Sequence, residues 1–273
     1  MTRREFIGCG LGAAGAMVLS GCTGLTREDR TLRLACQMWS VKDIWQKNGD
    51  ITSVFPRLAA LGYEGVQSKA FWDCDPDRLE KALVASGLKI ADMPVGFAEL
   101  ETESALAKTV AFCKRFDVDF VYIPWFKSKT LDGWRDFARK LDEYGRQLAP
   151  QGIRIGYHNH LHEFTERVDG FHPGDVLVNY PTFNFELDVG PILESRRSPS
   201  ELLRKMPGRV PGIHAKPYPG SYAGASNDRQ DWPAILAAAQ AIGTKWIVVE
   251  CEQRKNTFAD VKASAVYFRR LGV

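Results

Sequence analysis

The sequence predicts an α/β protein folded as a single (β/α)8 TIM barrel that is preceded by an export signal. After residue 30, short apolar runs alternate with longer amphipathic stretches, an alternation typical of a parallel sheet covered by helices. The 273 residues leave room for one such barrel, which needs about 250 residues, and for little else. Eight apolar runs are the expected strands: Leu32–Trp39, Gly65–Ser68, Lys89–Met93, Phe120–Pro124, Arg154–His160, Phe183–Asp188, Val210–Ala215 and Trp246–Glu252.

The stretches between these runs carry apolar residues three and four positions apart, a spacing that predicts helices. The expected helices are Ile51–Leu61, Pro76–Ser86, Glu103–Phe116, Leu131–Leu148, Pro199–Met206, Trp232–Ile242 and Phe258–Leu271. Several end at a glycine just before a strand, as at Gly62, Gly87 and Gly152, where glycine permits a left-handed C-cap. This repeated unit favours a closed barrel over a doubly wound open sheet, because no glycine-rich phosphate loop follows the first strand. Only Thr165–Asn179 lacks a long helical pattern, and we expect a loop or short helix there.

The first 22 residues have the pattern of an export signal. Arg3 and Arg4 precede a short apolar run rich in glycine and alanine, which is similar to the twin-arginine signal and too short for a spanning helix. The run ends in Leu-Ser-Gly-Cys, which resembles a bacterial lipobox, so that Cys22 would carry a lipid anchor at a membrane surface. We therefore expect a signal at residues 1–22, a linker at 23–30 and the barrel at 31–273, in the periplasm or cell envelope.

Charge and cysteine usage exclude some partners and cofactors. The formal net charge is +3 and basic residues are spread among acidic ones, so the chain lacks the basic stripe expected of a nucleic-acid-binding protein. Four cysteines lie in the predicted barrel, without a C-x-x-C pair: Cys36, Cys74, Cys113 and Cys251. Their wide spacing favours small buried side chains over a metal site or a disulfide framework.

Polar residues at the ends of four successive strands are the candidates for chemistry, because strand ends of such a barrel converge on one mouth. These ends are Tyr157-His158-Asn159-His160, Glu186-Leu187-Asp188, His214-Ala215-Lys216 and Glu250-Cys251-Glu252. The alternation of side chains along a strand places His158 with His160 and Glu186 with Asp188, each pair on one face. The sequence thus brings imidazole and carboxylate groups together at one rim.

We predict that His158, Asp188, His214 and Glu250 hold a divalent metal ion. A mixed nitrogen and oxygen set suits Mn²⁺, our first choice, and also Co²⁺, Mg²⁺ or Zn²⁺, whereas the lack of a thiolate argues against structural zinc. Each residue alone has an ordinary alternative, a hydrogen-bonded core histidine or a helix-capping acid. Together on successive strands they favour the metal, because neighbouring buried charges cost several kcal/mol unless a metal or ion pair compensates.

These strand ends also carry a family resemblance that extends over nearly all of the predicted barrel. The segments resemble the xylose isomerase-like TIM-barrel superfamily, in particular its sugar phosphate isomerase/epimerase-type members. The segments that carry it are Gly156–His160, Phe185–Val189, Ile213–Lys216 and Val248–Glu250, supported by Gln37–Asp43, Pro124-Trp125 and Asp231–Ile235.

The resemblance implies a divalent metal held by Glu, Asp, His and Glu from strands five to eight. Asp188, His214 and Glu250 match the last three, whereas His158 stands where many relatives have the first Glu. Gln67 and Pro94 also stand where relatives often have Glu and His. The two-carboxylate proton transfer of the epimerases therefore needs another base here.

The expected reaction is removal of a proton next to a sugar carbonyl, with the metal stabilising the resulting enediolate. Glu250, His158 or His160 is the expected base, and Glu163 is an alternative to His160 for the missing strand-five carboxylate. Returning the proton elsewhere gives isomerisation or epimerisation. Expelling a β-substituent instead gives elimination, as in the dehydratase and keto-glycoside lyase members that the resemblance brings into view. Expected substrate contacts are Trp39, Trp125, Glu163, Lys216 and Arg229.

Two other classes of function compete with the enzyme. A metal-dependent abasic-DNA endonuclease on the same barrel would need more histidine and glutamate ligands and a basic groove, and export argues against it. The intact set of Asp188, His214 and Glu250 argues against a lipid-anchored sugar-binding protein without catalysis.

The expected location also bears on the substrate. An exported enzyme is expected to meet free or keto sugars rather than phosphorylated ones.

Overall fold

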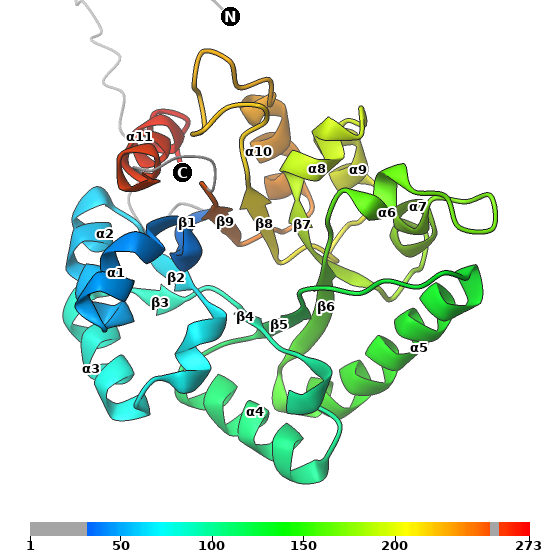
Figure 1. The fold of residues 1–273 in the computed structure, drawn as a ribbon, viewed down its shortest axis with the longest axis horizontal. Coiled ribbons are helices and arrows are strands. Elements are labelled where there is room, and N and C mark those ends of the chain that lie inside the picture. The colour runs from blue at the N-terminus through cyan, green and yellow to red at the C-terminus, as the bar shows by residue number, and fades with distance from the viewer. Residues whose placement is uncertain (1–31, 252–256) are drawn as a thin grey trace, which may run out of the picture.

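The computed structural model describes residues 32–251 and 257–273 and shows the predicted parallel barrel (Figure 1). The predicted signal, linker, lipidated Cys22 and Glu252 lie outside the described residues. The strands form one parallel sheet in the order β3-β2-β1-β9-β8-β7-β6-β5-β4. They are β1 Arg33–Gln37, β2 Gly65–Gln67, β3 Lys89–Ile90, β4 Met93–Pro94, β5 Phe120–Ile123, β6 Arg154–His158, β7 Asn184–Asp188, β8 Gly212–Ala215 and β9 Trp246–Val249.

The barrel closes through the segment that the sequence predicts as a single strand, the third of the eight. Its first part, β3, pairs with β2, and its second part, β4, pairs with β5. Ala91 still donates its backbone N–H to Val66 O, and Val95 donates to Tyr122 O, so the hydrogen bonding passes from one neighbour to the other across this segment. The prediction of eight strand positions is therefore confirmed, with the third position split in two.

The helices surround the sheet as predicted (Figure 1). Those predicted from periodicity appear within a few residues, and the short α7 occupies the weak unit at residues 165–179. Three short helices of four to seven residues, α1, α6 and α8, were not predicted. The helices are α1 Lys42–Asn48, α2 Phe55–Leu61, α3 Pro76–Ser86, α4 Glu103–Arg115, α5 Leu131–Leu148, α6 His162–Thr165, α7 Pro173–Val178, α8 Val189–Glu194, α9 Pro199–Arg204, α10 Trp232–Ala241 and α11 Thr257–Arg270.

Local sequence explains where these helices begin and end. The Thr130 hydroxyl accepts the backbone N–H of Gly133 and caps the start of α5, whose apolar side chains then turn toward the barrel. Gly62 and Gly87 end α2 and α3 at φ of 83° and 69°, the left-handed conformation predicted for them. The chain therefore turns at each of these glycines and enters the next strand, β2 after Gly62 and β3 after Gly87.

Burial separates the barrel core from its functional end. Strands β5, β8 and β9 consist only of buried residues, as expected for a parallel sheet covered on its outside. Cys36, Cys113 and Cys251 are buried and Cys74 is half-buried, and all four are free thiols. None of the helices in the described part of the chain is both long enough and apolar enough to cross a membrane.

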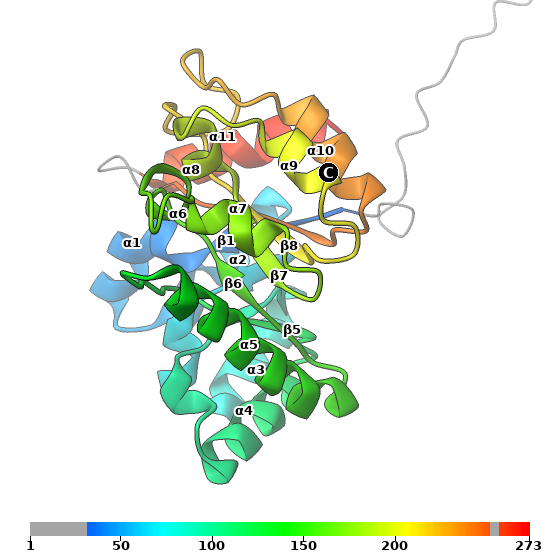
Figure 2. The same ribbon diagram turned by 90° about the vertical axis from the view of Figure 1, so that its right-hand side faces the viewer.

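The mouth of the barrel lies where the strands end. Figure 2 shows that α1, α6 and α8, which follow β1, β6 and β7 within a few residues, gather on the same side of the molecule. This is the carboxyl end of the parallel strands, the end at which barrel enzymes build their active sites.

Candidate metal and substrate site

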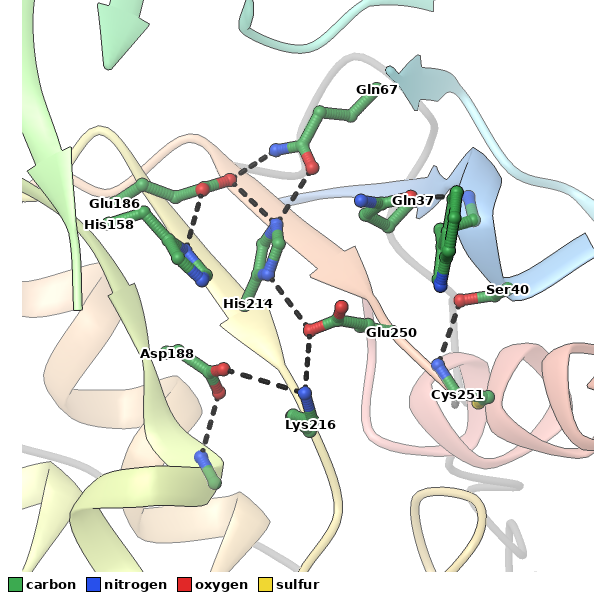
Figure 3. A network of polar contacts seen from close by, with 12 residues as sticks. Gln37, Ser40, Gln67, His158, Glu186, Asp188, His214, Lys216, Glu250 and Cys251 are labelled. Atoms are coloured by element: carbon green, nitrogen blue, oxygen red, sulfur yellow. Dashed lines mark hydrogen bonds and ion pairs between the residues drawn. The ribbon is translucent and has the colours of Figure 1, made fainter. Parts of the chain in front are cut away.

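Three buried side chains from neighbouring strands form the centre of the site. His158 and Asp188 are the last residues of β6 and β7, and His214 pairs with Asp188 across β7 and β8. One ligand atom from each of these three residues lies within 4.8 Å of the others. The sequence prediction that these three meet at the barrel rim therefore matches the structure (Figure 3).

Glu250 and Lys216 join the cluster from β9 and β8. Glu250 Oε2 lies 3.1 Å from His214 Nδ1 and 3.3 Å from Lys216 Nζ. Lys216 Nζ is also 4.0 Å from Asp188 Oδ2, so the ammonium group connects two carboxylates (Figure 3). Glu250 directly follows β9, which places its carboxylate beside His214 rather than deeper in the barrel.

Asp188 is held in place from two directions. Its Oδ1 accepts the backbone N–H of Gly190 at 3.0 Å and thereby caps the start of α8. The Asn159 amide binds the Asp188 backbone on both sides, accepting its N–H at 3.0 Å and donating to its carbonyl at 3.1 Å. The second oxygen, Oδ2, is the one that lies toward Lys216.

A fully buried carboxylate, Glu186, lies behind the two histidines. It accepts from His158 Nδ1 at 3.0 Å and from His214 Nε2 at 3.0 Å. Gln67 donates to Glu186, and its Oε1 lies 2.8 Å from His214 Nε2. A carboxylate in this position fixes the orientation of a metal-binding imidazole and raises its basicity. The other ring nitrogens, His158 Nε2 and His214 Nδ1, are the ones that would bind a metal, and His214 Nδ1 lies beside Glu250 Oε2.

Glu186 and Gln67 were not among the predicted site residues. The available signal was the alternation that puts Glu186 on the same face of β7 as Asp188, one layer deeper in the barrel. Beyond Gln67 the network continues to Asp92, whose Oδ1 accepts from Gln67 Nε2 at 2.5 Å. These buried groups connect β2 and the third strand position to the cluster.

The charges of the cluster suit a cation. Burial alone would raise the pKa of Glu186, but the imidazoles of His214 and His158 outweigh it and hold the pKa at about 2. Burial would lower the pKa of His214, yet Glu186 and Glu250 raise it well above its usual value. Burial raises the pKa of Asp188 to about 6 against the opposing pull of Lys216. Asp188 and Glu250 thus lie beside His158 and His214, with Glu186 behind the two rings, and this set of nitrogen and oxygen donors fits a divalent metal ion.

His160 lies beside the cluster without joining it. Its ring packs 4.7 Å from Trp125 and 4.9 Å from His158, measured between centroids. Its buried Nδ1 has no hydrogen-bond partner among the residues described. Burial lowers the pKa of His160 to about 3, helped by His158 and His162, so the ring is neutral at neutral pH.

Two neighbouring cavities open at the mouth. One has a volume of about 510 Å³ and is lined by Trp125, Asp188 and Lys216, among others. The second, of about 300 Å³, is lined by Trp39 and His214. His158, His160 and Glu250 line both cavities. The structure therefore gathers most of the predicted residues around one mouth.

Two of the predicted substrate contacts do not fit this arrangement. Glu163 is fully buried and lines neither cavity, because the Tyr157 hydroxyl and the His160 backbone N–H hold its carboxylate inside the wall. Arg229 is exposed on the loop before α10 and also lines neither cavity. Glu163 thus supports the β6 end from behind, and of the two alternatives for a base only His160 faces the mouth.

Comparisons with known proteins agree with this architecture. A solved sugar phosphate isomerase/epimerase from Parabacteroides distasonis is similar at 21% identity, with 90% of this chain and 97% of that chain covered and a TM-score of 0.71. A D-allulose 3-epimerase from Methylomonas sp., solved in complex with D-allulose, is similar at 12% identity, with 89% and 97% covered and a TM-score of 0.64. At these identities the likeness shows the fold.

A curated relative and a family model add to the structural likeness. An inosose dehydratase from Clostridium tetani is 24% identical over 186 residues, which cover 58% of this chain and 60% of that protein. The model of the xylose isomerase-like TIM barrel matches residues 55–271. The match spans all of the strands except β1 and all four strand ends that build the cluster. The chain therefore belongs to the xylose isomerase-like TIM-barrel family.

Proposed function

We propose that this protein is a metal-dependent sugar isomerase or epimerase that removes a proton from the carbon next to a sugar carbonyl. The observation that carries the proposal is the buried convergence of His158, Asp188 and His214, with ligand atoms within 4.8 Å of one another, at the mouth where two cavities of about 510 and 300 Å³ meet. The likeness to a D-allulose 3-epimerase solved with its sugar supports the same class of reaction.

The residues that would hold the metal are His158, Asp188, His214 and Glu250. When bound, a divalent cation such as Mn²⁺ supplies electrophilic stabilisation of the negative charge that develops on the substrate oxygens. Glu186 keeps His158 Nε2 and His214 Nδ1 turned toward the cluster through its contacts at 3.0 Å. Asp188 is kept rigid by the Gly190 N–H and the Asn159 amide.

Glu250 is the group that this chain offers for proton removal. Its carboxylate is nearly buried at the point where both cavities meet, and Lys216 Nζ lies 3.3 Å from its Oε2. The ammonium group holds the Glu250 carboxylate in position at the mouth. His160 Nδ1, which has no partner among the described side chains, is placed to exchange a hydrogen bond with a substrate hydroxyl. Return of the proton to the opposite face or to the neighbouring carbon completes epimerisation or isomerisation.

Elimination is the second candidate, and the curated relative favours it, because that protein is an inosose dehydratase. Both reactions begin with loss of the same proton and differ in whether a group at the β-carbon departs. The replacement of the expected strand-five glutamate by His158 favours elimination as well, since epimerisation uses an acid and a base on opposite faces of the substrate.

The proposal also includes a location. The signal predicted at residues 1–22 would bring the enzyme to free or keto sugars outside the cytoplasm.

Proton exchange tests the proposed function directly. The Mn²⁺-loaded protein, incubated with ketoses and 3-keto-glycosides in D₂O, is expected to introduce deuterium at the carbon next to the carbonyl, which NMR detects. Appearance of an isomer assigns isomerase or epimerase activity, and release of the β-substituent assigns elimination. If sugars bind but none exchanges deuterium above the rate of the metal alone, the protein is a sugar-binding protein and the enzyme proposal is wrong.

A further inference from the structure

We propose that the mouth binds a sugar made of two linked units, such as a disaccharide or glycoside, with one unit in each cavity. The inference rests on the proposed function and extends it by naming the size and class of the substrate. The carbon that loses its proton would then lie at the boundary between the two units, next to the His158, Asp188 and His214 cluster.

The first observation is the way in which the two cavities meet. Their volumes of about 510 and 300 Å³ each lie within the range of roughly 300–1,000 Å³ found for small-molecule sites. They share His158, His160 and Glu250, whereas Asp188 lines only the larger and His214 only the smaller. The candidate metal cluster therefore lies on the boundary, and neither cavity alone contains all of its residues.

The second observation is an exposed tryptophan in each cavity. Trp39 follows β1 in the smaller cavity and is 48% exposed, and Trp125 follows β5 in the larger and is 54% exposed. An indole ring that lines a cavity suits a sugar, because a flat apolar ring packs against the C–H face of a sugar. Phe171, another aromatic side chain among the exposed large hydrophobics of the described chain, lines neither cavity.

Each cavity is also lined by polar groups that the other cavity lacks. The larger contains Glu166, Glu194 and the Lys216 ammonium, and the smaller contains Gln37 and Ser68. An apolar ring with a few hydrogen-bonding groups is the lining that a hydroxylated ring requires. A single sugar that fills one cavity would leave the tryptophan and the polar groups of the other cavity without a ligand. A two-unit sugar engages both.

Binding to the full-length, Mn²⁺-loaded protein tests this inference. D-Fructose serves as the one-unit probe, and maltulose and cellobiulose serve as two-unit probes that carry the same ketose end. Calorimetric titration is expected to show at least about tenfold tighter binding of one or both disaccharides, because the second unit adds contacts in the second cavity. Equal or tighter binding of D-fructose, or absence of binding by all three sugars, would overturn the proposal.

Substitution of each tryptophan assigns the units to the cavities. Trp39→Ala and Trp125→Ala are each expected to weaken disaccharide binding about tenfold, whereas only one of them weakens D-fructose binding. Phe171→Ala is the matched control and leaves all affinities unchanged, and circular dichroism melting confirms that the variants fold. If neither tryptophan variant changes disaccharide binding, the two-cavity assignment is wrong. Deuterium exchange with D-fructose is scored separately, so failure of the proposed enzyme activity is distinguishable from failure of two-unit binding.

Discussion

Asp188→Asn is expected to weaken both Mn²⁺ binding and proton exchange strongly. The substitution keeps the shape of the side chain and the oxygen that accepts the Gly190 N–H, so the start of α8 stays capped. It removes the negative charge from the cluster and the anionic oxygen that faces Lys216. We expect Mn²⁺ affinity to fall more than about a hundredfold, because loss of a direct ligand costs more than loss of a residue that only contacts a ligand. We expect the rate of deuterium exchange to fall about a thousandfold. Calorimetric titration with Mn²⁺ and NMR-detected deuterium exchange measure the two effects.

Asp142→Asn is the control for loss of a carboxylate elsewhere on the barrel. Asp142 lines a cavity with Arg154 and Asn184, the first residues of β6 and β7, at the end opposite the mouth. Its side chain accepts from the hydroxyls of Tyr180 and Thr182. The control should keep both the Mn²⁺ affinity and the rate of deuterium exchange within about twofold of those of the unmodified protein. A twofold change is small, since a change of about 1.4 kcal/mol in binding free energy alters affinity about tenfold. Mn²⁺ binding by Asp188→Asn at unmodified affinity would contradict the assignment of Asp188 as a ligand.

Glu186→Gln is expected to weaken Mn²⁺ binding by about 10- to 100-fold, although Glu186 does not contact the metal position. The charged acceptor behind His158 and His214 becomes an amide, which pairs less well with two imidazole N–H groups. Both rings then lose the partner that fixes their orientation and basicity. The substitution should therefore raise the Kd for Mn²⁺, measured by titration, while the site still saturates at high metal concentration.

Glu163→Gln is the matched control for this variant, because Glu163 is equally buried and lies shortly after β6, the strand that carries His158. Its partners are the Tyr157 hydroxyl and the His160 backbone N–H rather than the cluster. We expect it to lower the thermal midpoint, at a cost of about 1–3 kcal/mol for a disturbed buried hydrogen bond, with Mn²⁺ affinity within about threefold. Equal losses of metal affinity in both variants would mean that Glu186 acts only on stability.

The fold was predictable from sequence because each barrel unit repeats the same local signals. Apolar runs of strand length, helical spacing between them and glycines such as Gly62 and Gly87 all agree with one another. The short α1, α6 and α8 were missed because four to seven residues contain too few turns to show a period. The split between β3 and β4 was missed for another reason: hydrogen bonding to two different neighbours leaves no trace in a continuous apolar run.

The candidate metal cluster was predictable because strand alternation fixes which residues share a face. Asp188 and His214 were found in this way, since both come at the ends of strands that pair with each other. Alternation does not tell how deep in the barrel a residue lies, and so Glu186 received no role. Glu163 was assigned to substrate because of its position after the strand, but the turn of α6 folds it back under Tyr157. Such a contact depends on tertiary packing that no local pattern records.

Anomalous diffraction from Mn²⁺-soaked crystals tests the central claim most directly. We predict one strong manganese peak, about 2.0–2.5 Å from side-chain atoms of His158, Asp188 and His214, the range typical of nitrogen and oxygen ligands. A manganese peak elsewhere, or none at the mouth under saturating metal, would contradict the claim that these three strand ends form a metal site.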